Sequence, residues 1–248
     1  MRTAISPTTA KVHPAVVSAA QASGRPAYLK PIATSSTADI MAAGLDRLGT
    51  SHTYAQGKMV VEQGDAAEYV FKITSGALRA VRLLPDGRRY VTRFLLPGDF
   101  FGLAERSEYG DSFEVVKDAT VVRYARSGFD AYLEGNTRAG RHFLGLVCGE
   151  LTAAQDRLLL LGRKNAIERM ATFLLAMADR SQTNGKATTE IELPMNRTDV
   201  ADYLGLTVET VSRLLTQLRS KRIIDLPSAN HVVFRNREAL EDMSAGDV

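Results

Sequence analysis

The sequence predicts an α+β protein in three consecutive parts: an antiparallel roll of short strands, one long helix, and a unit of short helices with a small sheet. Three observations predict this order. Glycine turns separate β-prone runs in the first half, an apolar heptad stripe follows, and two short helices flank a glycine near the C-terminus. With 248 residues, 45% of them hydrophobic, the chain is long enough to bury more than one core.

The roll is preceded by residues 1–38, which are rich in Ala, Ser, Thr and Pro and show no sustained period, so we expect a mobile tail there. Turn sequences such as Ser75-Gly76 and Pro85-Asp86-Gly87 then separate short runs of strand-forming residues. Many short strands at near-regular spacing are typical of a jelly roll, which we expect over residues 39–136. The runs are Met59–Val61, Tyr69–Thr74, Ala77–Leu84, Tyr90–Leu96 and Thr120–Tyr124.

Residues 137–162 have the pattern of one long helix. Apolar residues recur at alternating intervals of three and four, a heptad stripe that favours a two-stranded seam between two copies of the chain. A helix buried within a single chain is the alternative. Polar residues on the opposite side, Arg141, Glu150, Gln155 and Asp156, favour a partly exposed helix, and Cys148 is expected to be a small packed side chain. The stripe consists of Leu144, Val147, Leu151, Ala154, Leu158 and Leu161.

Composition excludes several classes of protein. The net charge of +3 and the pI of about 9.0 permit nucleic-acid binding without proving it. The single cysteine, Cys148, excludes a disulfide, a Cys-rich zinc site and a four-cysteine iron–sulfur cluster within one chain. No apolar run reaches the roughly 18 residues that cross a bilayer, and no signal-peptide pattern opens the chain. We therefore expect a cytoplasmic protein that contacts no membrane.

The unit at residues 163–248 contains the most informative stretch, Met195–Leu218. Asn196 can cap a first short helix, Gly205 supplies a left-handed turn, and Thr207 caps a second helix whose apolar positions face inward. This spacing predicts a helix-turn-helix. Around it we expect an amphipathic helix over Lys164–Ala178, a strand over Glu190–Leu193, and a wing made of Arg222–Leu226 and His231–Phe234.

The outward face of the second helix suggests what this unit binds. An arginine there can bond guanine O6 and N7 together, and a glutamate can accept from cytosine N4, which makes Glu209 and Arg213 candidates for base readout. A local basic run, Arg213, Arg219, Lys221 and Arg222, is suited to phosphates. The sequence therefore predicts a winged helix-turn-helix that binds double-stranded DNA.

In these features the sequence resembles the CRP/FNR family of bacterial transcription regulators, and within it the FixK branch. The resemblance covers nearly everything after about residue 50, and its anchors are the Gly64-Asp65 turn, Leu96–Leu103, the long helix and Leu204–Arg213. It implies a β-roll sensor domain, a dimerisation helix and a C-terminal winged helix. It also implies a DNA-binding homodimer that contacts RNA polymerase and acts as an activator.

The resemblance also assigns DNA contacts residue by residue. The FNR-type motif Glu-x-x-Ser-Arg implies a palindrome with TTGAT-like half-sites, read by Glu209, Ser212 and Arg213. Arg197 and Thr210 match phosphate-contacting positions of the family. The full set of expected phosphate contacts is Arg197, Thr207, Thr210 and Arg219.

Where the sequence departs from the family's pattern, it lacks the residues for three known kinds of sensing: of a cyclic nucleotide, of oxygen through an iron–sulfur cluster, and of oxidation through a cysteine. Cyclic-AMP receptors hold the nucleotide phosphate with an Arg-Ser pair, whereas Glu108–Phe113 has no arginine and Asp111 would repel a phosphate. FNR-type oxygen sensors use several cysteines, and some FixK proteins carry an oxidation-sensitive cysteine where this chain has Ser212. We expect no cyclic nucleotide, no iron–sulfur cluster and no other cofactor, and DNA binding without a small ligand.

Three other functions compete with this prediction. A haem or other small molecule in the roll, with His52 or His142 as axial ligand, would gate the same DNA binding. A cupin-like enzyme needs clustered His and carboxylate ligands, whereas the histidines here are scattered, so we expect no catalytic residue and no metal site. A pure dimerisation scaffold would have no use for the basic recognition helix. Exposed loops at Pro85–Arg89 and Ser181–Thr189 are the candidates for polymerase contact.

Overall fold

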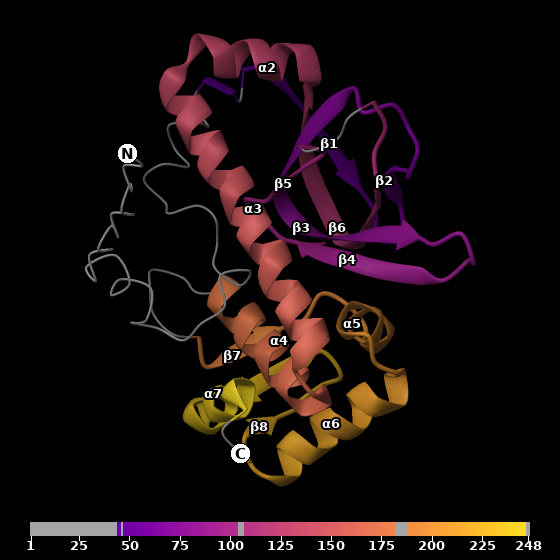
Figure 1. The fold of residues 1–248 in the computed structure, drawn as a ribbon, viewed down its shortest axis with the longest axis vertical. Helices are drawn as coiled ribbons and strands as arrows, with labels where there is room; N and C mark the ends of the chain where they lie inside the picture. The colour runs from indigo at the N-terminus through magenta and orange to yellow at the C-terminus, as the bar shows by residue number, and fades with distance from the viewer. Residues whose placement is uncertain (1–43, 46, 104–106, 182–187, 247–248) are drawn as a thin grey trace, which may run out of the picture.

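The computed structural model describes residues 44–45, 47–103, 107–181 and 188–246. The expected tail, residues 1–38, lies outside these ranges. Figure 1 shows the long helix α3 running from the top of the molecule to the bottom, with the strands of the roll beside its upper half and the short helices around its lower end. The predicted α+β order of roll, long helix and helix-turn-helix unit is confirmed.

The roll is one antiparallel sheet, in which β6 and β3 are the long central strands and the order is β1-β6-β3-β4, with β2 on β6 and β5 on β3. Four of the described elements were not predicted: β1, β5, α2 and α7. The strands of the roll are β1 (Gly49–Tyr54), β2 (Met59–Val61), β3 (Tyr69–Leu83), β4 (Arg89–Leu95), β5 (Phe100–Phe101) and β6 (Ser112–Ala125).

The predicted turn at Ser75-Gly76 is wrong. The two runs on either side of it form the single strand β3, which pairs with β6 through a register shift at this point. Gly76 has a φ of +81°, and a Cβ built there would lie 2.1 Å from the carbonyl oxygen of Asp118. The glycine therefore allows a bulge within a strand, because only glycine fits both the positive φ and the close approach of β6.

The interior of the roll is filled by aromatic rings. Phe71 stacks on Phe101 at a centroid distance of 4.7 Å, and Phe101 stacks on Phe113 at 4.5 Å. All three side chains are buried, and Tyr109 closes the cluster by donating from its hydroxyl to the Tyr69 carbonyl. This packing makes the inside of the roll a hydrophobic core. The two histidines considered as haem ligands lie on β1 (His52) and near the start of α3 (His142).

The helix α3 (Thr137–Arg163) follows α2 (Arg126–Gly135), and its buried residues contact two different parts of the molecule. Leu146 packs against the roll and Leu160 packs against the C-terminal unit. One expectation for this helix is wrong, because Cys148 is exposed and not packed. Glu150, on the polar side of the helix, is partly exposed and pairs with Arg93 of the roll. Within the part of the chain that the structure describes, no helix is long and apolar enough to cross a bilayer.

The C-terminal unit packs around α4 (Ala166–Arg180), which begins two residues later than predicted because Asn165 and Glu168 form a capping box. Its core continues into the roll, since Val81, Val91 and Phe94 belong to the same buried cluster. The remaining elements are β7 (Glu190–Glu192), α5 (Arg197–Leu204), α6 (Val208–Ser220), β8 (Ile224–Asp225), β9 (His231–Phe234) and α7 (Arg237–Ala245).

Candidate nucleic-acid interface

The helices α5 and α6 form the predicted helix-turn-helix, and each local signal in the sequence has the expected effect. The Asn196 side chain accepts from the backbone N–H of Asp199 at 2.9 Å and so caps α5. Gly205 ends α5 with a φ of +62°, and the Thr207 hydroxyl accepts from the backbone N–H of Thr210 at 3.2 Å to cap α6. The turn between the helices is thus defined by the left-handed Gly205 and the Thr207 cap.

The helix α6 has one buried face and one face that is free to meet a ligand. Glu209 and Arg213 are exposed on the free face and Ser212 is half-buried between them. Hydrogen bonds from its own backbone N–H and from the Thr207 hydroxyl lower the pKa of Glu209, so its carboxylate stays ionised as an acceptor. The inward side chains are Val211, Leu214, Leu215 and Leu218.

The expected phosphate contacts lie at both ends of α6 and at the start of α5. Thr207 and Thr210 bring their hydroxyls within 3.1 Å of each other at its N-terminus, where backbone N–H groups also point outward. Arg219 is exposed in its last turn. Arg197, at the start of α5, donates from Nη1 to the Ser212 hydroxyl at 3.1 Å, so it already lies beside the base-reading face.

The wing consists of β8 and β9, which pair as predicted, with β7 as a third strand on the other side of β9. The helix α7, which was not predicted, supports this unit from behind. Arg237 of α7 pairs with Asp179 of α4 at 2.6 Å, and Lys164 donates to the carbonyl of Ser244 at 2.7 Å. Burial lowers the pKa of Lys164, although the charges of Glu168 and Asp156 oppose this shift.

Sequence reasoning missed the contact between α5 and the roll. Asp199, which is 1% exposed, accepts from Arg79 and also from Arg89 at 3.0 Å, and Asp202 accepts from Arg89 at 2.7 Å. Burial lowers the pKa of Arg89, but the hydrogen bonds and charges of Asp202 and Asp199 outweigh it and raise that pKa above its ordinary value. No signal in the sequence could have found these pairs, because each joins residues more than a hundred positions apart.

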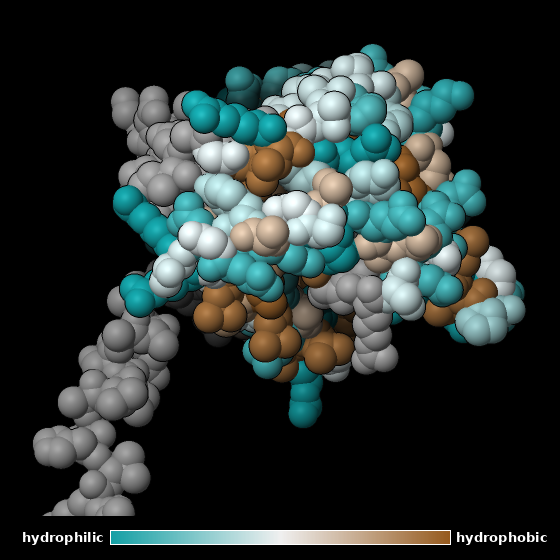
Figure 2. Space-filling view, turned by 90° about the horizontal axis from the view of Figure 1, so that it is seen from above, coloured by the Kyte–Doolittle hydropathy of each residue, from teal (hydrophilic) through white to brown (hydrophobic). Residues whose placement is uncertain are grey.

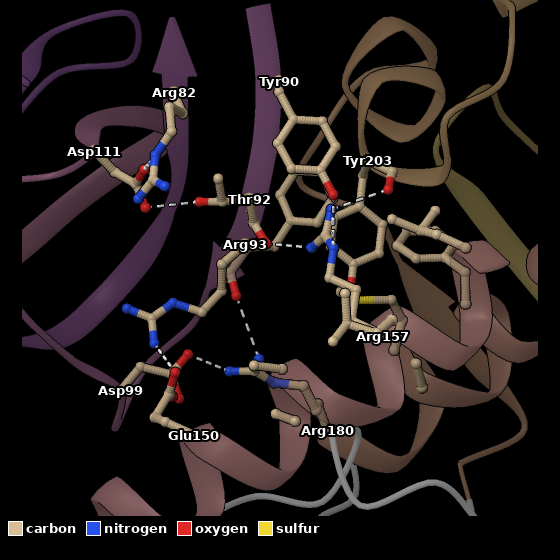
Figure 3. Close-up of a pocket in the computed structure, with 18 residues that line it drawn as sticks. Arg82, Tyr90, Thr92, Arg93, Asp99, Asp111, Glu150, Arg157, Arg180 and Tyr203 are labelled. Atoms are coloured by element: carbon tan, nitrogen blue, oxygen red, sulfur yellow. Dashed lines mark hydrogen bonds and ion pairs between the residues drawn. The ribbon is translucent and has the colours of Figure 1, made fainter. Parts of the chain in front are cut away.

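A cavity of about 590 Å³ lies next to this contact, between β4, α3, α4 and α5 (Figure 3). Arg180 of α4 crosses it to pair with Asp99, in the turn between β4 and β5. Asp111, expected to repel a phosphate, pairs with Arg82 at 2.7 Å and accepts from the Thr92 hydroxyl at 3.0 Å. Its charge is therefore compensated within the roll.

A capped helix-turn-helix with a paired wing, preceded by a long helix and a β-roll, defines a DNA-binding transcription regulator and not an enzyme. Residues 168–243 match the family model for the Crp-like helix-turn-helix domain, and residues 51–136 match the cyclic nucleotide-binding domain. The chain belongs to the CRP/FNR family of transcription regulators, and within it to the FixK-like branch. This excludes the cupin-like alternative.

Three relatives illustrate this relationship. The nitrogen fixation regulation protein FixK of Azorhizobium caulinodans is 42% identical over 199 residues, which cover 80% of each chain. The transcriptional activatory protein AadR of Rhodopseudomonas palustris is 37% identical, over 76% of this chain and 79% of the relative. The solved structure of FixK2 from Bradyrhizobium japonicum aligns with a TM-score of 0.74 and 39% identity, covering 79% of this chain and 96% of that one.

Proposed function

We propose that the protein binds a palindrome of TTGAT-type half-sites as a homodimer and activates transcription there, without a cyclic nucleotide or an iron–sulfur cluster. The observation that carries this proposal is the free face of α6, on which Glu209, Ser212 and Arg213 follow the FNR-type spacing. A capped, well-packed helix holds these side chains at a fixed angle to the rest of the unit, as sequence readout in a major groove requires.

The chemistry of this face supports a particular DNA contact for each side chain. Arg213 would bond guanine O6 and N7 together, Glu209 would accept from cytosine N4, and Ser212 would complete the base contacts. The exposed carboxylate of Glu209 is ionised at neutral pH and is therefore purely an acceptor. The surrounding phosphates would be held by Arg197, Thr207, Thr210 and Arg219.

The heptad stripe of α3 supports the homodimer. Leu144, Leu151 and Leu158 are 62%, 61% and 73% exposed in the single chain, although they are large and apolar. Seen from above, hydrophobic side chains gather at the lower edge of Figure 2, the side of the molecule along which α3 runs in Figure 1. An exposed apolar patch of this kind marks an interface. A second copy of the chain fits it, because two helices with the same heptad stripe can pack as a two-stranded coiled coil. The other members of the seam are Val147, Ala154 and Leu161.

Two observations support activity without a bound nucleotide. The pairing of Asp111 with Arg82 occupies a stretch where cyclic-AMP receptors need a free arginine. The aromatic core inside the roll, with Phe101 fully buried, fills space that a ligand would need. Activation is suggested by the name of the AadR relative, a transcriptional activatory protein, and an activator would contact RNA polymerase. The β-hairpin tip at Pro85–Arg89 is the described candidate for that contact, and Ser181–Thr189 lies largely outside the described residues.

The division of the chain is part of the same proposal. The roll would occupy residues 39–136, the dimerisation helix 137–162 and the DNA-binding domain 163–248, after a tail at 1–38. The two matched family models, at 51–136 and 168–243, fall inside the first and last of these parts. A DNA-binding regulator of this type would act in the cytoplasm.

Fluorescence anisotropy of the aerobically purified protein on a TTGAT–ATCAA palindrome, with and without cyclic AMP, tests the proposal. We expect tight, salt-sensitive binding without ligand that is lost in Arg213→Ala. Arg138→Ala, at an exposed position in the first turn of α3, is the matched control and should bind as the wild type does. Binding only after cyclic AMP is added, or only under anaerobic conditions, would show that the roll senses a signal and would overturn the ligand-free part of the proposal.

A further inference from the structure

Four arginines hold the helix α5 at both ends, and together with their acceptors they form what we call the α5 clamp. On the side of the roll, Arg79 pairs with Asp199, and Arg89 pairs with both Asp199 and Asp202. On the side of the long helix, Arg157 of α3 and Arg169 of α4 donate hydrogen bonds to the last two carbonyls of α5. The clamp consists of Arg79, Arg89, Arg157, Arg169, Asp199, Asp202 and the carbonyl oxygens of Tyr203 and Leu204.

Arg157 is the central member of this clamp. It donates to the Tyr203 carbonyl at 3.1 Å, to the Tyr90 hydroxyl at 3.1 Å and to the Val91 carbonyl at 2.7 Å, and also to the carbonyl of Thr92. Its guanidinium lies 3.9 Å from the centroid of the Tyr203 ring. Figure 3 shows it between the rings of Tyr90 and Tyr203, so one side chain joins α3, β4 and α5.

Arg169 makes a second connection of the same kind. It donates to the Leu204 carbonyl at 3.0 Å, and also to the carbonyls of Leu161 and Lys164 at 2.8 and 2.9 Å. The last carbonyls of a helix have no partner within it and carry the negative end of its dipole. Both arginines therefore satisfy the end of α5 just before Gly205, and Arg169 ties that end directly to the end of α3.

This arrangement has a geometric consequence for a dimer. Two members of the proposed seam lie at the clamp: Leu158 is next to Arg157 in α3, and the carbonyl of Leu161 is itself an acceptor of Arg169. The helix α6 follows α5 after a short turn, so the orientation of α5 relative to α3 fixes that of α6 relative to the dimer axis. In a dimer, the separation of the two recognition helices determines which half-site spacing can be bound.

We propose that Arg157, supported by Arg169 and by the Arg89–Asp202 pair, is a positioning residue that sets the half-site spacing this regulator accepts. The inference rests on the proposed function, since it presumes a homodimer on a palindrome. None of these side chains lies on the outward face of α6, so the clamp acts through the placement of α6 and not through contact with bases. Loosening it would widen the range of tolerated spacings and leave the reading of a single half-site intact.

The test is a series of full-length duplexes in which the spacer between TTGAT and ATCAA grows by one base pair at a time, with one duplex that carries a single half-site. In Arg157→Met, whose side chain is similarly long but cannot donate, we expect the ratio of affinities between the best spacer and its neighbours to fall by about threefold to thirtyfold. Affinity for the single half-site should stay at the wild-type value. Arg138→Met, on the same helix and exposed, is the control and should keep the wild-type ratio.

Asp202→Asn provides a second variant that opens the clamp from the roll side, at a side chain that is 27% exposed and so carries less risk of misfolding. As in Arg157→Met, the ratio of affinities between the best spacer and its neighbours should fall. If both variants fold and lose affinity in parallel for every spacer and for the single half-site, or keep the wild-type profile, the positioning role is overturned. If the wild type itself shows no preferred spacing, the proposed palindrome recognition fails, which is a separate result.

Discussion

The Nη1 of Arg197 donates to the hydroxyl of Ser212 at 3.1 Å, so a residue expected at the phosphates touches one expected at the bases. The contact joins the start of α5 to the middle of α6 across the free face of the helix-turn-helix. On DNA, the Arg197 guanidinium can turn to a phosphate, and the Ser212 hydroxyl is then released to a base edge. The two residues are thus coupled before DNA arrives.

Replacing Arg197 by alanine should weaken binding to all DNA sequences alike. One phosphate contact is lost, so the slope of log affinity against log salt should become shallower by about one. Anisotropy titrations on specific and random duplexes at several salt concentrations measure this. Ser212→Ala is the contrasting variant: it removes a proposed base contact, so it should leave the salt slope unchanged and alter the ranking of half-site sequences. A sequence-dependent loss in Arg197→Ala would contradict the phosphate assignment.

Replacing Leu151 by glutamate should abolish the dimer without unfolding the chain. Its side chain is 61% exposed in the single chain, so the charge costs little there but is buried in a two-stranded seam. Analytical ultracentrifugation should show a monomer, and affinity for the palindrome should fall. Leu146→Ala is the contrasting variant on the same helix. Because Leu146 is buried against the roll, this change should lower the free energy of unfolding by about 2–5 kcal/mol while the dimer persists in the folded fraction.

Replacing Gly205 by alanine should cost about 1 kcal/mol of unfolding free energy. The φ of +62° disfavours any side chain, whereas the nearest atom to an added Cβ, in Arg169, lies 3.6 Å away and does not clash. The penalty is therefore conformational, and chemical denaturation should detect it as a lower midpoint with an unchanged slope. Gly145→Ala, in the middle of α3 with open space around it, should instead be neutral or stabilising. Equal effects at both positions would argue against the left-handed turn.

Replacing Asp199 by alanine should lower the free energy of unfolding by about 2–3 kcal/mol. The change removes one of two carboxylates from each arginine, because Arg79 keeps its pair with Glu114 at 2.7 Å and Arg89 keeps its pair with Asp202 at 2.7 Å; charge-assisted hydrogen bonds are lost, but neither arginine is left unpaired. It also removes half of the capping box of α5. Asp86→Ala is the control. The side chains of Asp86 and Arg88 are 51% and 76% exposed, so their ion pair should contribute less than about 1 kcal/mol to the free energy of unfolding. Thermal and chemical denaturation compare the two.

Short-range chemistry explains what could be predicted. Asn196, Gly205 and Thr207 act on backbone groups within three or four residues of themselves, so a reader of the sequence can place both helices of the helix-turn-helix. The heptad of α3 could be read in the same way, because helical periodicity maps sequence spacing onto one face. The strands of the roll were found for the most part, but Ser75-Gly76 was mistaken for a turn, since a glycine with positive φ serves turns and bulges equally well.

The remaining features depend on where distant segments meet. Nothing near Glu150 in the sequence indicates that Arg93 will lie beside it, and nothing near Asp199 indicates Arg79. The sequence by itself determined the helix caps, the left-handed turn, the apolar stripe and the residues offered to DNA. Only the tertiary structure decided which polar side chains join the roll to α3 and α5, because an ion pair depends on separation in space, which neither periodicity nor propensity encodes.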